Sequence, residues 1–64
     1  MRKLALVKIS EKYENQMHFK DDVLIYLGEI PNMKGHGVFI GSKTGKLYSG
    51  YHIEQFRELT DEET

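Results

Sequence analysis

The chain alternates short apolar runs with turn signals about every ten residues, and this spacing constrains its fold more than any other feature. The run at 23–27 is continuous and ends at Gly28. Two further runs, at 37–41 and 46–51, are separated by a four-residue segment that contains Gly45. Glycine in such a segment supplies the positive φ that a tight hairpin turn needs. Many short strands with closely spaced turns are typical of an all-β barrel or sandwich.

The remaining segments predict further strands, but they do not decide the secondary structure of the C-terminal region. Residues 3–10 alternate weakly and predict a strand, and the polar residues 11–16 predict a long loop. Ile53, Phe56 and Leu59 are spaced three apart. This spacing fits one helix over 51–64, and it equally fits a single turn at 52–56 followed by a short strand at 57–59.

The composition indicates one small domain over residues 1–64. The 64 residues include no cysteine and are 39% hydrophobic, so the chain has material for one core and no disulfide or thiolate metal site. We therefore expect packing to supply its stability and the cytoplasm to be its compartment. The apolar run after Met1 stops at Lys8, which is too short for a signal segment or a membrane span, so we expect no membrane partner.

Charge is nearly balanced overall but unevenly placed. The net charge of −1 lacks the basic footprint of a dedicated nucleic-acid binder. Residues 31–50 carry three lysines and no acid, whereas 53–64 carry five acids against Arg57 alone. The lysines, Lys34, Lys43 and Lys46, form a basic patch only if the fold gathers them.

The glycine-rich stretch at 35–46 does not match a phosphate-binding loop. The phosphate-loop pattern needs four residues between its first Gly and its Gly-Lys pair, with Ser or Thr next. Here three residues separate Gly41 from Gly45-Lys46, and Leu47 follows. The dinucleotide pattern fails because Ile40 stands where a small residue is required. We assign these glycines to turns and expect no nucleotide cofactor.

The order of the segments resembles the Src-homology-3 family. Residues 5–7, 14–22 and 23–27 are similar to its first strand, its long acidic loop with a diverging turn, and its second strand. Residues 42–46 resemble its distal hairpin, and 50–56 resemble the corner that carries a short 3₁₀ turn. The resemblance covers about residues 4–59 and implies a five-stranded SH3-like barrel, with 60–64 as an acidic tail.

The resemblance extends to the scaffold and not to the family's peptide site. Peptide-binding members hold a proline-rich helix in an aromatic groove. Only the last aromatic position is retained here, as Phe56, while Gly37 and Val38 replace the tryptophan pair and Ile53 replaces the corner proline. The chain has no tryptophan. We therefore expect the scaffold with a rebuilt binding face and no recognition of proline-rich peptides.

Alternation along the strands predicts which side chains point inward. If Ile25 and Ile40 face the core, Tyr26 and Phe39 point outward and become candidates for a binding face. The expected core then consists of Leu4 or Ala5 together with Leu6, Phe19, Val23, Ile25, Leu27, Val38, Ile40, Leu47 and Leu59.

No arrangement of residues indicates catalysis or metal binding. His18, His36 and His52 are 18 and 16 residues apart, which matches no metal-ligand signature. The adjacent Asp21 and Asp22 fit a diverging turn better than a paired acid and base. We therefore expect a protein that is not an enzyme and that carries no cofactor or metal.

These observations predict a non-catalytic accessory or regulatory protein that binds another protein and leave self-association open. By the resemblance, the loops at 11–16 and 29–37 flank one face, which suits a protein or acidic peptide partner. Its candidate residues are Tyr13, Met33, Lys34, His36, Tyr51 and Phe56. The alternative is nucleic-acid binding on the Lys34, Lys43 and Lys46 side, with Tyr26, Phe39 or Tyr48 stacking on bases.

Overall fold

Five strands form one antiparallel sheet in the computed structural model, which describes all of residues 1–64. The strand order across the sheet is β4-β3-β2-β1-β5. The chain contains no α-helix, so the all-β expectation is confirmed. The strands are β1 (Leu6–Ile9), β2 (Leu24–Glu29), β3 (His36–Gly41), β4 (Leu47–His52) and β5 (Phe56–Glu58), and the 3₁₀ turns are η1 (Glu11–Tyr13), η2 (Ile53–Gln55) and η3 (Asp61–Glu63).

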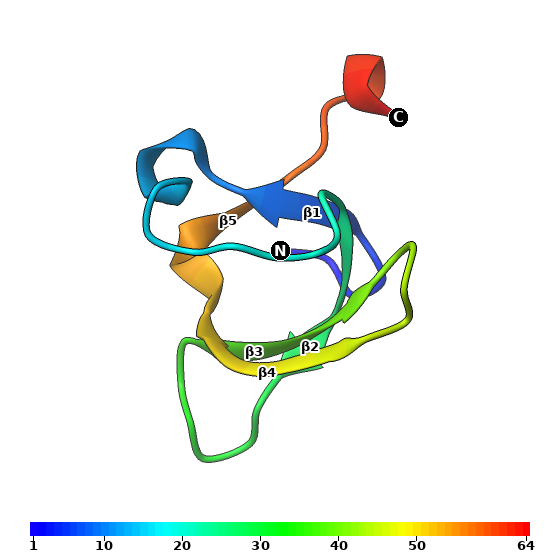
Figure 1. Cartoon of the computed structure of the whole chain (residues 1–64). Helices are drawn as coiled ribbons and strands as arrows, with labels where there is room; N and C mark the ends of the chain where they lie inside the picture. The colour runs from blue at the N-terminus through cyan, green and yellow to red at the C-terminus, as the bar shows by residue number, and fades with distance from the viewer.

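The sheet bends about β2. This strand pairs with β1 through Leu24 and Ile25 and with β3 along its length, so it belongs to both halves of the sheet. A register shift between Tyr26 and Gly28 marks a bulge, which increases local twist. Figure 1 shows β1 and β5 lying across from β3 and β4, with the interior between them. Since β4 and β5 do not pair with each other, hydrogen bonds do not close the sheet.

The turns lie where the sequence places them. Residues 42–46 join β3 to β4, and Gly45 has a φ of +74° while its N–H donates to the Gly41 carbonyl. The region 51–64 is not one helix: η2 follows β4 and leads directly into β5. The spacing of Ile53, Phe56 and Leu59 therefore comes from a turn and a short strand.

The prediction of which faces point inward is wrong. The buried hydrophobic core consists of Val7, Leu24, Tyr26, Phe39, Tyr48 and Phe56. Phe39 is 0% exposed, and Tyr26 is also buried, although both were expected outside. Leu6, Leu27 and Leu47 were expected inside and are 40%, 36% and 60% exposed. The partly buried Ala5 and Phe19 do pack against the core, whereas Leu4 is exposed.

Available space decides between the two faces. Both alternating sets of β2 and β3 are apolar, so hydrophobicity does not distinguish them. On β3 the inward set is Gly37, Phe39 and Gly41, and a Cβ atom at Gly37 would lie 3.0 Å from the Tyr26 ring. A small, strongly bent sheet accommodates large rings only where small residues alternate with them. The aliphatic set lacks glycine and takes the roomier outer face.

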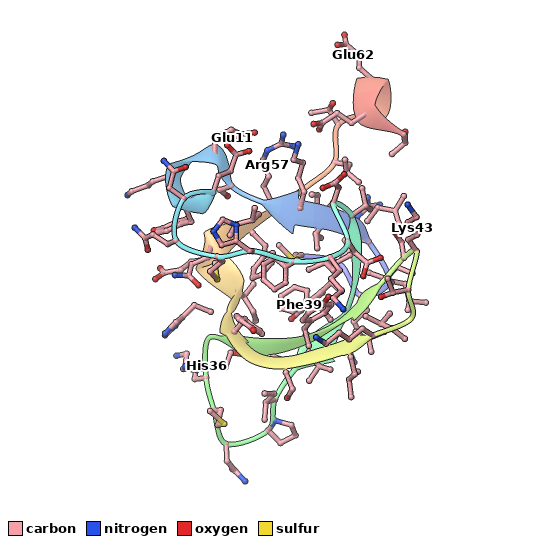
Figure 2. The ribbon with its side chains drawn as sticks, in the orientation of Figure 1. Glu11, His36, Phe39, Lys43, Arg57 and Glu62 are labelled. Atoms are coloured by element: carbon pink, nitrogen blue, oxygen red, sulfur yellow. The ribbon has the colours of Figure 1, made fainter.

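Aromatic rings fill most of the interior. Phe39 stacks on Phe56 at 4.3 Å between centroids and lies 5.5 Å from Tyr26. Phe19, from the segment before β2, meets Tyr48 edge-on at 5.0 Å. Figure 2 shows Phe39 between the two halves of the sheet. Edge-on and offset contacts of this kind add to the stability that burial provides.

The β3–β4 turn is held by the carboxylate of Asp21. Its oxygens accept hydrogen bonds from the backbone N–H groups of Lys43 and Thr44 at 2.8 and 2.9 Å and from the Thr44 hydroxyl at 2.6 Å. Asp21 is 2% exposed, and its carboxylate occupies the space that a Cβ atom at Gly41 would need. The Thr44 hydroxyl, followed by these N–H groups, lowers the pKa of Asp21 despite its burial.

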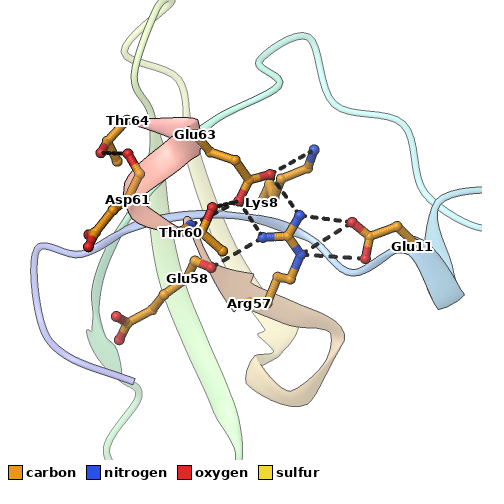
Figure 3. A network of polar contacts seen from close by, with 8 residues as sticks. All are labelled: Lys8, Glu11, Arg57, Glu58, Thr60, Asp61, Glu63 and Thr64. Carbon is orange, nitrogen blue, oxygen red and sulfur yellow. Dashed lines mark hydrogen bonds and ion pairs between the residues drawn. The ribbon is translucent and has the colours of Figure 1, made fainter.

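Arg57 links β5 to η1 and η3 (Figure 3). Its guanidinium donates to the Glu11 carboxylate at 2.8 Å and to the Glu63 carboxylate at 2.7 Å. Thr60 and Glu63 form a capping box, and Lys8 lies 3.9 Å from Glu63. The hydrogen bond from Arg57 is the main reason that the pKa of Glu63 falls to about 2. The acidic segment 60–64 is thus held against the sheet by Arg57 and does not extend as a free tail.

We expect Asp21→Asn to lower the melting temperature at pH 7 by several degrees, because the amide replaces a carboxylate that accepts three hydrogen bonds. The folded-state pKa of Asp21 is lowered, so its contribution to stability is present above the unfolded pKa and disappears as pH falls through the folded pKa. The difference between wild type and variant should therefore narrow below about pH 4.

Thermal melts followed by circular dichroism from neutral to acidic pH measure this difference. Asp22→Asn is the matched control, since Asp22 is exposed and makes no side-chain hydrogen bond within the chain. Equal melting temperatures for wild type and Asp21→Asn at pH 7 would contradict the assigned role of Asp21.

Candidate interaction face

An uncovered aliphatic face lies on the outside of β2, β3 and β4. We define this aliphatic face by five outward side chains. Ile25, Ile40 and Leu47 are direct cross-strand partners and form one row, and partners across antiparallel strands share a face. Leu6 pairs with Ile25 and continues the row around the bend onto β1. The five residues are Ile25, Leu27, Val38, Ile40 and Leu47.

The aliphatic face contains no charged side chain. Leu27 and Leu47 are exposed, and Ile25, Val38 and Ile40 are half-buried. Single exposed leucines are ordinary, but here Ile25, Val38 and Ile40 join Leu27 and Leu47 into one apolar patch across three strands, and such patches often mark contact surfaces. These residues were assigned to the core from the sequence, because their aliphatic character does not reveal which side of the sheet they occupy.

Two histidines border one end of the aliphatic face. At one end, His36 pairs with His52 across the strands, and their ring centroids are 4.3 Å apart. At the other end, the exposed Lys46 precedes β4, and its Nζ lies 5.4 Å from the centre of the Tyr48 ring, on the inner side of the sheet. Glu29 lies near the same end as the histidines, and its carboxylate accepts a hydrogen bond from the Gly35 N–H. The stretch 31–50 itself contains no acid.

The six residues expected to form a partner site are distributed between the core and the surface. Phe56 is buried against Phe39, and the half-buried Tyr51 packs 5.3 Å from Phe19, so both contribute to the interior. The exposed Met33 and Lys34 lie in the loop between β2 and β3, and His36 follows on β3. Tyr13 is half-buried on η1, with Lys12 5.6 Å from its ring. Binding by the exposed members stays a prediction.

The alternative nucleic-acid surface lacks its expected stacking rings. Tyr26, Phe39 and Tyr48 are all buried, so none presents a ring face to solvent. Lys34 precedes β3 and Lys43 follows it, and a strand of this length separates them by ~20 Å. The lysines therefore do not gather into one patch.

A small hollow of about 350 Å³ lies between β1 and the segment that leads into β2. His18 is its only histidine, and the carboxylate of Asp21 is already occupied by the β3–β4 turn. No three His, Asp or Glu side chains anywhere in the chain converge to hold a metal ion. The hollow is lined by Lys8, Ile9, Glu14, Met17, His18, Phe19, Asp21, Asp22 and Leu24.

No protein-family model, curated protein or solved structure matches the chain. None of its helical turns has the length and apolar character needed to cross a bilayer.

The reversed assignment of the two faces gives a direct test. Phe39→Ala should cost about 3–5 kcal/mol, because it empties the centre of the core. Leu47→Lys should change the free energy of unfolding by less than about 0.5 kcal/mol, because Leu47 already lies largely in solvent. Denaturant titration of both variants measures these values. If Leu47→Lys destabilised the protein as much as Phe39→Ala, the faces would be assigned the wrong way round.

Proposed function

We propose that this chain is an SH3-like small barrel that works as a non-catalytic interaction module in the cytoplasm. Three observations support this proposal: the middle strand is shared by both halves of the sheet, a tight hairpin joins β3 to β4, and a 3₁₀ turn separates β4 from β5. The cytoplasmic assignment rests on the absence of cysteine. Binding rather than catalysis is supported by the exposed apolar surface.

The observation that carries the function is the row formed by Ile25, Ile40 and Leu47. Three strands of up to six residues give a face of ~14 Å by ~20 Å. An α-helix with its side chains is ~10–12 Å wide, so one partner helix of about four turns covers it. Packing a helix against a sheet is a standard way to bury the apolar faces of both.

The charge of the rim selects among such helices. His36 and His52 border the face at one end, and the exposed Lys43 and Lys46 stand in the β3–β4 connection at the other end. Acidic residues beside the apolar stripe of a helix would meet the two lysines, whereas basic residues would be repelled by them. We therefore infer that the partner is a protein presenting an amphipathic helix with acidic flanks.

Synthetic peptides test this function directly. The probe is a helical peptide with a leucine stripe flanked by glutamates, and the matched control has the same stripe flanked by lysines. Methyl NMR should show chemical-shift changes at Ile25, Leu27, Val38 and Ile40 with the acidic probe. Leu27→Glu should weaken binding about tenfold or more, since a 1.4 kcal/mol loss is sufficient for that factor.

Asn15→Glu is the control variant, because Asn15 is exposed after η1, outside β2, β3 and β4. It should retain the affinity of the wild type. Shifts confined to the loops at 11–16 and 30–35, or equal binding of the acidic and basic probes, would show that the aliphatic face is not the site.

A further inference from the structure

The outer edge of β4 is unpaired. β4 is the last strand on its side of the sheet and forms ladder bonds only with β3. Its six residues, Leu47–His52, include no proline, lysine or acid. Natural edge strands usually carry such residues, because a bare edge pairs readily with another strand. This edge is therefore open to strand addition.

The open part of the edge is short and can be located. The Gly41 N–H donates to the Lys46 carbonyl, so residue 46 turns its carbonyl toward β3. Since hydrogen-bonding direction alternates along a strand, Leu47 and Ser49 turn their N–H and C=O groups outward. Gly50 has a φ of +88° and is the extra residue between the pairs Val38–Ser49 and Gly37–Tyr51. This bulge ends the regular edge after Ser49.

The charges at the two ends of β4 select its partner. Lys46 stands immediately before the strand, and Glu54 stands just after it on η2. Both side chains are exposed, and neither forms an ion pair within the chain. When Leu47 of one copy pairs with Ser49 of the other, Lys46 lies opposite the second copy's Gly50, and the second copy's Glu54 lies four residues farther on, at the same end of the paired strands. The two-fold symmetry makes this contact twice.

We propose that two copies of this chain associate through antiparallel pairing of their β4 edges at Leu47 and Ser49, guided by reciprocal Lys46–Glu54 ion pairs. The exposed Leu47 side chain of each copy then packs beside the second copy's β4. The net charge of −1 per chain opposes this association only weakly. The proposal concerns the edge of the sheet and goes beyond the helix-binding function of the aliphatic face.

Charge reversal tests the partner and its orientation together. An interface this short should associate weakly, with Kd on the order of 100 μM. Sedimentation velocity over a concentration series at low salt should show wild-type dimers. Lys46→Glu and Glu54→Lys should each weaken association about tenfold, because each variant places two like charges together. An equimolar mixture of the two variants should recover wild-type association, since both contacts are then opposite in charge.

Lys12→Glu is the matched control, because Lys12 is an exposed lysine on η1, outside β4. It should leave association unchanged. Circular dichroism verifies that every variant is folded. Amide hydrogen exchange on the wild type should slow at Leu47 and Ser49 as concentration rises, which only edge pairing explains.

Three results would overturn the proposal: a monomer at every concentration, a mixture of the two charge variants that does not associate better than either alone, or dimerisation without added protection at Leu47 and Ser49. Leu27→Glu distinguishes a failure of dimerisation from a failure of the proposed helix binding. Leu27 lies on β2, with β3 between it and β4, so this variant should dimerise normally while losing the helical probe.

Discussion

The ring of Phe39 sets the dimensions of this protein. It lies between the two halves of the sheet, stacked on Phe56 and in contact with Tyr26. Gly37 and Gly41 flank it on the same side of β3 and leave the room that the neighbouring groups occupy. The bend at β2 follows from wrapping a single sheet around this ring. The exposure of the aliphatic residues follows as well, because the interior has no space for a second apolar layer.

Local signals were enough to predict the strands and the turns. Glycine at position 45 and the spacing of Ile53 and Phe56 reflect backbone geometry, which depends mainly on neighbouring residues. The side of the sheet that faces inward depends on volume, and alternation alone cannot supply it when both sets are apolar. One signal was available in the sequence: Gly37, Phe39 and Gly41 share a face, and small residues around a ring indicate the crowded side.

The candidate surface was missed for the same reason. Once Ile25 and Ile40 were assigned to the core, only aromatic and loop residues remained as candidates for a partner site. The role of Asp21 was equally hidden, because its partners Lys43 and Thr44 lie more than twenty residues away in the chain. Contacts of that separation depend on how the sheet bends, and no local pattern encodes them.

The helix-binding face and the β4 edge adjoin each other, and this proximity links the two proposals. A two-fold axis between paired edges stands perpendicular to the sheet, so both aliphatic faces would point to the same side of the dimer. A partner with two suitable helices would then engage both faces at once. The second contact would form at the high effective concentration that linkage provides, even though each contact is weak alone.

β2 and β3 carry apolar side chains on both faces, which makes mispairing of the strands a risk during folding. A slip of one residue in strand pairing would turn Ile25 and Ile40 inward and still bury hydrophobic surface, so hydrophobicity does little to penalise the error. The lack of space around Phe39 penalises it, and the Asp21 carboxylate adds a second penalty. It fits only when the β3–β4 turn presents the N–H groups of Lys43 and Thr44 to it, and in a slipped sheet it would be left without these donors. The aspartate therefore helps to favour the native register over the slipped one.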